Sequence, residues 1–326
     1  MRMFLPCRFL LVFLLFIVSL NVFANSKLTE VTRIASDVSA TDQVRIKNIL
    51  EEVGKSLEGT YLDLWHGNTT LFIGISSDAS SYTLQDHESF SQFTILLREN
   101  FSEEELLHEI GHVMLNSFIF RAFPYMILGK EQLLIDGDHR EKLDTLTDLK
   151  RLSHLIDYAK GMWFGERFHD RAVKIDYQLN EFFADLFACL IRKDGDTVAK
   201  AFLQENPSPE ILKELYHNDP NFRMEVGKGR SFTRIWLRHD WEFNHPYTYF
   251  SSIRNAAWKL LTPYLDDPIL FTLLAMTVNK FLYDLTFDPP RSGEERKEYT
   301  PDLIIAEFIQ SLQFFIDNLD KVRSRP

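Results

Sequence analysis

Apolar residues recur at helical spacing near the start of the chain and at strand-like spacing soon after it. Between residues 42 and 57 they stand at Ile46, Ile49, Leu50, Val53 and Leu57. This spacing predicts an amphipathic helix over 42–57, with Thr41 as its N-cap. Three runs that alternate or cluster apolar residues follow, at Thr60–Trp65, Thr69–Ile75 and Gln92–Leu97. We interpret them as strands, because clusters of Gly, Asn, Asp and Ser separate them.

The pattern becomes helical from residue 102 onward. Ser102 and Glu105 form a capping box, which predicts a helix from Glu103 to about Phe120. Further helices are predicted at 141–160, 174–192, 196–205, 209–217, 248–261, 268–284 and 301–323. We therefore predict an α+β fold that is mainly α, with a small sheet before a central helix and a helical C-terminal body.

The first 24 residues have the organisation of a secretory signal peptide. Two arginines precede the apolar run Phe9–Leu20, and small residues at Val22 and Ala24 suit cleavage after Ala24. The alternative is an uncleaved membrane anchor, because no charged residue lies between positions 9 and 26. We expect cleavage and a secreted or periplasmic location, with membrane contact only if the segment stays uncleaved.

Composition and charge narrow the functional classes. The chain has 326 residues, 45% of them hydrophobic, which is enough to bury a core. It carries 47 acidic and 36 basic residues, and this net charge of −11 speaks against nucleic-acid binding. The two cysteines cannot form a disulfide scaffold. After cleavage Cys189 is the only thiol, and we expect it to be buried and unreactive.

The motif HEIGH at 108–112 carries the most specific chemical signal. On a helix, His108 and His112 lie on one face, one turn apart, where both imidazoles can bind one zinc ion. Glu109 can then act as general base on a water molecule, and Gly111 is expected to remove bulk beside the metal. The alternative, a helix with two surface histidines, is disfavoured because the motif lies in a capped, amphipathic helix.

A catalytic zinc ion needs a third protein ligand. The metzincin class is excluded, because its extended motif would require Gly and His where the chain has Leu115 and Phe118. In the segment 180–190, NEFFADLFACL, Glu181 and Asp185 lie one helical turn apart among apolar residues. A buried carboxylate pair is costly unless a zinc ion and an imidazole N–H compensate it. The alternative is that both carboxylates face solvent.

The two motifs together resemble the gluzincin zinc metallopeptidases, the thermolysin-like class. The long gap between the motifs is more similar to the CAAX-processing and minimal-gluzincin branch. The resemblance covers about a third of the chain and implies a zincin-like fold that hydrolyses peptide bonds with one Zn²⁺ ion. It implies that Glu181 is the third zinc ligand and that Asp185 orients a ligand histidine. We expect this histidine to be His108, with Asn180 near His112. Unlike CAAX-processing enzymes, the chain lacks flanking membrane helices, so a lipidated substrate is not expected.

A weaker similarity to the same branch lies at 243–258, where a His-Pro pair precedes a predicted helix. His245 and Arg254 match a His-Pro…Arg element of that branch, although the gap between them is longer than the usual form. The resemblance implies that one of them serves the site. Either side chain, or Tyr247, could donate to the oxyanion that forms when water attacks a carbonyl. An ordinary loop before a helix explains this segment equally well.

The sequence therefore predicts a secreted or periplasmic zinc metallopeptidase that acts on a peptide or protein. We expect a signal peptide at 1–24, a zincin-like domain at 25–265 and a helical C-terminal extension at 266–326. The region 121–173 is expected to be a helical insert that could form a lid. One strand between 69 and 97 should offer its edge to an extended substrate. The alternative is an exported, catalytically inactive protein that binds zinc or a partner; the sequence does not indicate an oligomeric state.

Overall fold

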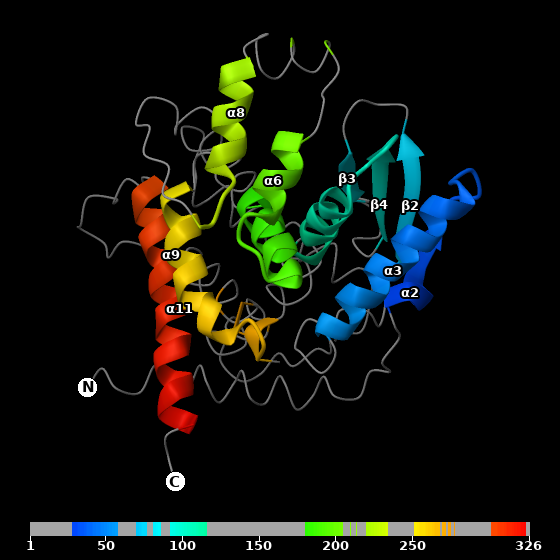
Figure 1. Cartoon of the computed structure of the whole chain (residues 1–326). Helices are drawn as coiled ribbons and strands as arrows, with labels where there is room; N and C mark the ends of the chain where they lie inside the picture. Colours follow the sequence, from blue (N-terminus) through cyan, green and yellow to red (C-terminus); the bar gives the residue numbers. More distant parts are fainter. Residues whose placement is uncertain are drawn as a thin grey trace, which may run out of the picture.

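A small mixed sheet and a set of helices share one apolar core (Figure 1). This computed structural model describes residues 28–57, 70–76, 81–85, 92–115, 180–204, 209, 213, 220–233, 251–267, 269–271, 273–274, 277 and 301–323. Helices predominate over the four-stranded sheet, so the predicted α+β, mainly α class is confirmed. The expected signal peptide, the strand Thr60–Trp65, the helices at 141–160 and 209–217, the insert 121–173 and His245 lie outside the described residues, apart from single positions.

The sheet has the strand order β1-β2-β4-β3. Its strands are β1 (Thr32–Ile34), β2 (Thr70–Ser76), β3 (Tyr82–Gln85) and β4 (Gln92–Arg98). β1, β2 and β4 run parallel, whereas β3 is antiparallel to β4. Among the described strands β3 pairs with β4 alone, so it lies at an edge. β2 and β4 match the predicted runs, but the short β1 and β3 were not predicted, since three or four residues give little periodicity.

One face of the sheet is buried against the helices. Alternate residues of β2 and β4 form this face: Leu71, Ile73, Phe93, Ile95 and Leu97. Thr83 of β3 pairs with Ile95, so it continues the same face at the edge of the sheet. Thr83 therefore adds a polar side chain at the edge where the apolar face of the sheet ends.

Two helices carry the sequence motifs. The motif helix (residues 103–115) contains HEIGH, and the NEFFAD helix (residues 180–192) contains the second motif. The predicted capping box of the motif helix is confirmed, because the Glu105 amide donates to the Ser102 hydroxyl at 3.1 Å and the Ser102 amide donates to the Glu105 carboxylate at 3.3 Å. Asn100, with a positive φ of 59°, turns the chain from β4 into this helix.

The remaining helices surround these two. They are α2 (Leu28–Val31), α3 (Ala40–Leu57), α6 (Thr197–Gln204), α8 (Pro220–Gly229), α9 (Ser251–Leu261), the 3-10 turn η2 (Thr262–Tyr264) and α11 (Pro301–Arg323). The N-cap prediction for α3 was wrong: Ser39, not Thr41, accepts the Asp42 amide at 3.1 Å, and Ser39 donates back to the Asp42 carboxylate. α8 was not predicted, because a proline and two glycines in ten residues mask its helical pattern.

The motif helix and the NEFFAD helix touch at Gly111. A Cβ atom at position 111 would lie 2.7 Å from the Cα atom of Ala184 and 3.2 Å from the Cβ atom of Phe187. Gly111 therefore serves the close approach of two backbones rather than space beside a metal, which corrects the expectation from the motif. The contact brings the polar residues of both helices face to face.

The C-terminal helix α11 packs against α9 (Figure 1). Its Phe308 meets Phe182 of the NEFFAD helix in a T-shaped ring contact, with centroids 5.4 Å apart. Both rings belong to the same buried apolar cluster as the sheet. Cys189 is also fully buried there, and burial raises the pKa of its thiol to about 12. No helix in the described part of the chain has both the length and the apolar character needed to cross a membrane.

Candidate metal centre

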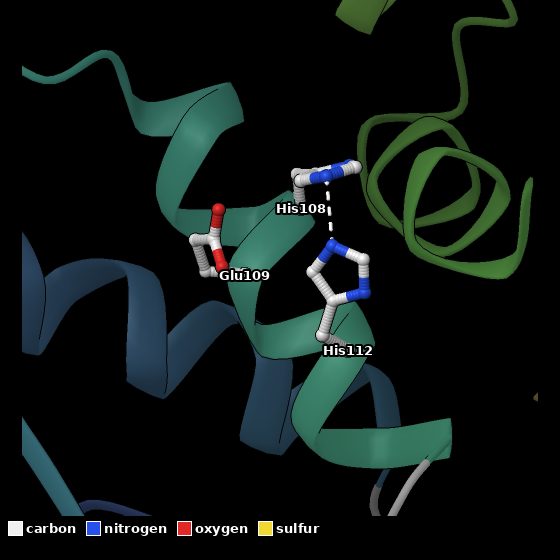
Figure 2. A group of neighbouring side chains, drawn as sticks. All are labelled: His108, Glu109 and His112. Carbon is white, nitrogen blue, oxygen red and sulfur yellow. Dashed lines mark hydrogen bonds between the residues drawn. The ribbon is translucent and has the colours of Figure 1, made fainter. Parts of the chain in front are cut away.

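The two motif histidines approach each other on one face of the motif helix. Figure 2 shows His108, Glu109 and His112 on this helix. The Nε2 atoms of the two imidazoles lie 3.0 Å apart, and the rings are almost perpendicular, at 84°. The ligand atoms of all three residues lie within 4.8 Å of one another. This group could therefore hold a metal ion.

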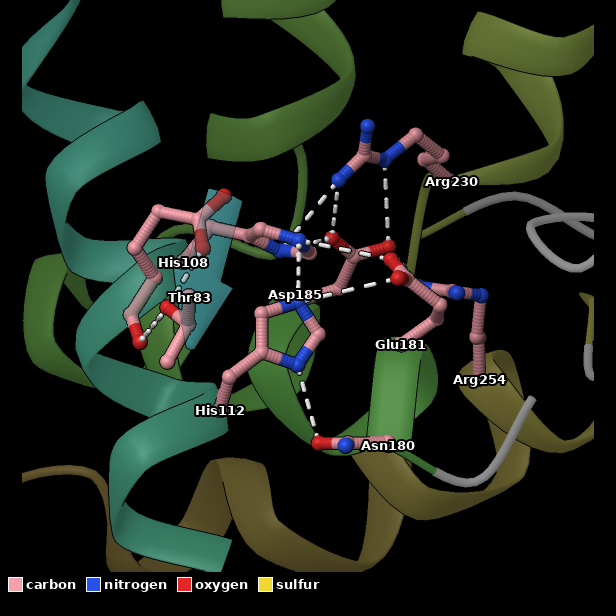
Figure 3. A network of polar contacts seen from close by, with 9 residues as sticks. Thr83, His108, His112, Asn180, Glu181, Asp185, Arg230 and Arg254 are labelled. Atoms are coloured by element: carbon pink, nitrogen blue, oxygen red, sulfur yellow. Dashed lines mark hydrogen bonds and ion pairs between the residues drawn. The ribbon is translucent and has the colours of Figure 1, made fainter. Parts of the chain in front are cut away.

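Glu181 reaches the same point from the NEFFAD helix (Figure 3). Its Oε2 lies 3.3 Å from Nε2 of His108, and its Oε1 lies 3.6 Å from Nε2 of His112. The side chain is 6% exposed, and no group in the described part of the chain donates a hydrogen bond to the buried Oε2. A buried carboxylate oxygen in this state is costly, so a cation between the three side chains would stabilise it.

The spacing of these three donors fits one small tetrahedral cation. With zinc–ligand bonds of about 2.0–2.1 Å, the donor atoms of a tetrahedral site lie about 3.3 Å apart. The two Nε2 atoms lie 3.0 Å apart, and each faces a different oxygen of Glu181, His108 facing Oε2 at 3.3 Å and His112 facing Oε1 at 3.6 Å. Two imidazoles and a carboxylate are also a common donor set for catalytic zinc. The residues present thus fit the metal that the HEIGH motif implies.

The other ring nitrogen of each histidine contacts an oxygen. Nδ1 of His108 lies 2.8 Å from Oδ1 of Asp185, and Nδ1 of His112 lies 2.8 Å from Oδ1 of Asn180. These contacts favour a hydrogen on Nδ1, which leaves the lone pair of Nε2 directed at the shared point. Of the residues that the two motifs suggested, the structure thus brings together His108, His112, Asn180, Glu181 and Asp185, with Glu109 beside them.

Asp185 is fully buried between two arginines (Figure 3). Arg230 donates Nε to Oδ2 at 3.2 Å and Nη2 to Oδ1 at 2.5 Å. Nη1 of Arg254 lies 2.7 Å from Oδ2. Burial alone would raise the pKa of Asp185, but the two guanidinium groups and His108 hold it well below its usual range. Asp185 is therefore a carboxylate, able to accept a hydrogen bond from His108.

The carboxylates of Asp185 and Glu181 together control the charge on His108. Burial would lower the pKa of His108, but the carboxylates of Asp185 and Glu181, which face its two ring nitrogens, raise it to about 9. Burial would raise the pKa of Glu181, but the two imidazoles bring it below its ordinary value. Without a cation, a proton on His108 compensates the carboxylates at neutral pH. A metal ion that binds there replaces this proton.

Glu109 has different surroundings from Glu181. The hydroxyl of Thr83 donates to Oε2 of Glu109 at 2.6 Å and lies 3.2 Å from the Glu109 carbonyl oxygen. Glu181 instead faces the two imidazoles at 3.3 and 3.6 Å. Glu181 thus faces both imidazoles, whereas a hydroxyl group holds Glu109 beside them.

Arg254 forms an ion pair with Asp185. Its guanidinium is completely buried and packs on the rings of Phe182 and Phe232, with Cζ 5.7 and 4.9 Å from their centroids. Its charged contact is with Asp185, so the structure places it beside the carboxylate that contacts His108. The other residue suggested by the His-Pro…Arg element, His245, lies outside the described residues.

Two residues of this network were not identified from the sequence. Arg230 follows α8, a helix that was not predicted, and Thr83 lies in the short strand β3. A single arginine or threonine in such segments has no characteristic spacing. Only the folded chain brings them to Asp185 and Glu109.

Comparison with protein-family models, with curated proteins and with solved structures finds no match to this chain. The resemblance to the gluzincins therefore stays a prediction from the two motifs.

Proposed function

We propose that the chain is a zinc metallopeptidase of gluzincin type, with a zincin-like fold, that hydrolyses peptide bonds outside the cytoplasm. The observation that carries the proposal is the convergence of His108, His112 and Glu181, with donor atoms 3.0–3.6 Å apart. Structural zinc sites have four protein ligands, whereas catalytic sites have three and keep one position open. With Glu109 hydrogen-bonded to Thr83, the described residues place three donor groups at the shared point, His108, His112 and Glu181, which favours the catalytic kind.

Each residue of the site has a defined task in this reaction. When bound, zinc supplies a Lewis acid that polarises the scissile carbonyl and lowers the pKa of a water molecule. Glu109 takes a proton from water on its carboxylate and gives it to the leaving amine. Asp185 and Asn180 hold the imidazole rings of the motif through their Nδ1 atoms.

The arginines act on Asp185 rather than on the reacting atoms. Arg230 and Arg254 keep this carboxylate ionised, and Asp185 in turn keeps His108 in the orientation that presents Nε2. In this account Arg254 positions a ligand, which differs from the oxyanion role that the sequence analysis considered for it. A donor to the oxyanion is then needed from elsewhere in the chain.

The edge strand β3 is the proposed binding site for an extended peptide. Among the described strands it pairs with β4 alone, and Thr83 places it next to Glu109. A peptide that adds to this edge by backbone hydrogen bonds would lie alongside the general base. The signal-like N-terminal sequence supports an exported location.

Metal analysis and turnover of a matched pair of variants test the proposal. The purified protein should contain one zinc per chain and cleave fluorescein-labelled casein. Glu109→Gln should keep the zinc and lose about 10²–10⁴-fold in rate, because the amide cannot accept the proton. Glu104→Gln, which removes a charge from the same helix outside the site, is the control and should retain activity. A protein that contains zinc but does not cleave would instead be the inactive zinc-binding protein.

A further inference from the structure

Two hydroxyl groups join the edge of the sheet to the motif helix. Ser81, directly before β3, donates to Oε1 of Glu105 at 2.5 Å. Thr83, which Figure 3 labels beside the site, donates to Oε2 of Glu109 at 2.6 Å. Two residues of a strand span about 6.6–6.8 Å. Four residues of a helix span about 6 Å. The strand and the helix are therefore in register, with one hydroxyl for each helical turn.

The two glutamates differ in how many donors hold them. Glu105 also accepts hydrogen bonds from Nε of Arg98, at 2.9 Å to Oε1 and 3.0 Å to Oε2, and from the Ser102 amide at 3.3 Å. Among the described residues, Thr83 is the hydrogen-bond donor to the Glu109 carboxylate. Loss of the Ser81 hydroxyl would leave Glu105 in place, whereas loss of the Thr83 hydroxyl would release Glu109.

A released Glu109 has an alternative position nearby. The residue is 5% exposed, and one of its carboxylate oxygens lies within 4.8 Å of the ligand atoms of His108 and His112. A buried carboxylate without a hydrogen-bond donor is stabilised by turning towards a cation. As an additional ligand it would fill the position that catalysis needs open.

We propose that Thr83 is a positioning residue that keeps Glu109 as a general base and prevents it from becoming a metal ligand. The threonine is well suited to this task, because its β-branched side chain has few rotamers and its backbone is fixed by pairing with Ile95. Its hydroxyl donates a hydrogen bond to Oε2 of Glu109, so Oε1 stays able to accept the proton from water. This proposal rests on the proposed function of Glu109.

The test uses the full chain loaded with Co²⁺ in place of zinc. The visible absorption of Co²⁺ is stronger in tetrahedral sites than in sites with additional ligands, so it reports on Glu109 without turnover. Thr83→Val keeps the shape of the side chain and removes the hydroxyl, and Thr83→Ser restores the hydroxyl. Ser81→Ala removes the neighbouring hydroxyl, which lies outside the site, and is the matched control.

We expect Thr83→Val to weaken the Co²⁺ absorption and to reduce kcat on labelled casein roughly 10–100-fold with little change in KM. Thr83→Ser should restore both quantities. Ser81→Ala should lower the Tm but leave the spectrum and kcat unchanged. In the Glu109→Gln background, Thr83→Val should leave the Co²⁺ spectrum unchanged, because the amide is a poor ligand.

A Thr83→Val protein with the spectrum and kcat of the wild type would overturn the proposal. A change of the spectrum in Ser81→Ala as large as in Thr83→Val would also overturn it, because the effect would then be a general loosening of the strand. If the wild type binds Co²⁺ but has no peptidase activity, the proposed function fails. The spectra of the Thr83 and Glu109 variants then still decide whether Thr83 keeps Glu109 from the metal.

Discussion

Both histidines of the proposed site are held by polar partners on the NEFFAD helix. Asp185 and Asn180 contact their second ring nitrogens, and Arg230 and Arg254 surround Asp185. In a low-dielectric interior each of these polar groups is stabilised only while its neighbour stays in place. The orientation of the ligands therefore depends on side chains that do not contact the metal.

A graded loss of zinc affinity is expected when these side chains are shortened. Asn180→Ala removes the partner of His112 and should weaken zinc binding about 10–100-fold. Glu181→Ala removes a proposed ligand and should weaken binding more than Asn180→Ala does. Competition with a fluorescent chelator measures both affinities. An affinity of Glu181→Ala equal to that of the wild type would mean that another residue is the third ligand.

Spacing along the chain accounts for the residues that could be identified from the sequence. His108 and His112, like Glu181 and Asp185, are four residues apart, and a helix places each pair on one face without any tertiary information. Arg254 was suggested by the resemblance alone, and its contact with Asp185 follows from the packing of α9. The sequence cannot show such contacts, because they join elements that are distant in the chain.

At the level of elements, the site depends on how closely the two motif helices approach. Gly111 lies against the backbone of Ala184, so the separation of the helices is set by the absence of a side chain. The pair His108 and His112 meets the pair Glu181 and Asp185 only because the two helices approach closely at Gly111. Helix periodicity predicted both helices, but it contains no information on their separation.

Gly111→Ala should force the helices apart. The new Cβ would lie 2.7 Å from the Cα atom of Ala184, and overpacking of this kind costs about 1–3 kcal/mol. Urea unfolding should show that loss, together with weaker zinc binding. Gly54→Ala in α3 is the matched control: its Cβ meets nothing within 4 Å, and alanine should stabilise the helix by about 0.4–1 kcal/mol. Equal stability changes in the two variants would contradict the role given to Gly111.

At the level of the whole molecule, the strands and helices around the site share one core. Phe308 of α11 packs on Phe182, next to Glu181 in sequence, although the sequence analysis assigned α11 to a C-terminal extension. The apolar periodicity of 301–323 predicted this helix, because its buried side is regular. Its place in the core was not predictable, since periodicity identifies a buried face but not the surface that covers it.

Removal of the metal should weaken the whole fold, because the proposed ligands come from two helices separated by the region 116–179. Zinc at about 100 times its Kd adds about 2.7 kcal/mol of stability. For a chain of 326 residues its removal should lower the Tm by about 4 °C. Thermal unfolding in excess chelator measures the shift, with zinc-saturated chelator as the control. An unchanged Tm would argue against a metal that joins the two helices.

The most direct test is anomalous diffraction at the zinc absorption edge from crystals of the zinc-loaded protein. The account predicts one strong peak bounded by Nε2 of His108, Nε2 of His112 and the Glu181 carboxylate, with Glu109 hydrogen-bonded to Thr83 and not bound to the metal. A peak elsewhere, or a zinc ion at the two histidines with Glu181 directed away from it, would contradict the account.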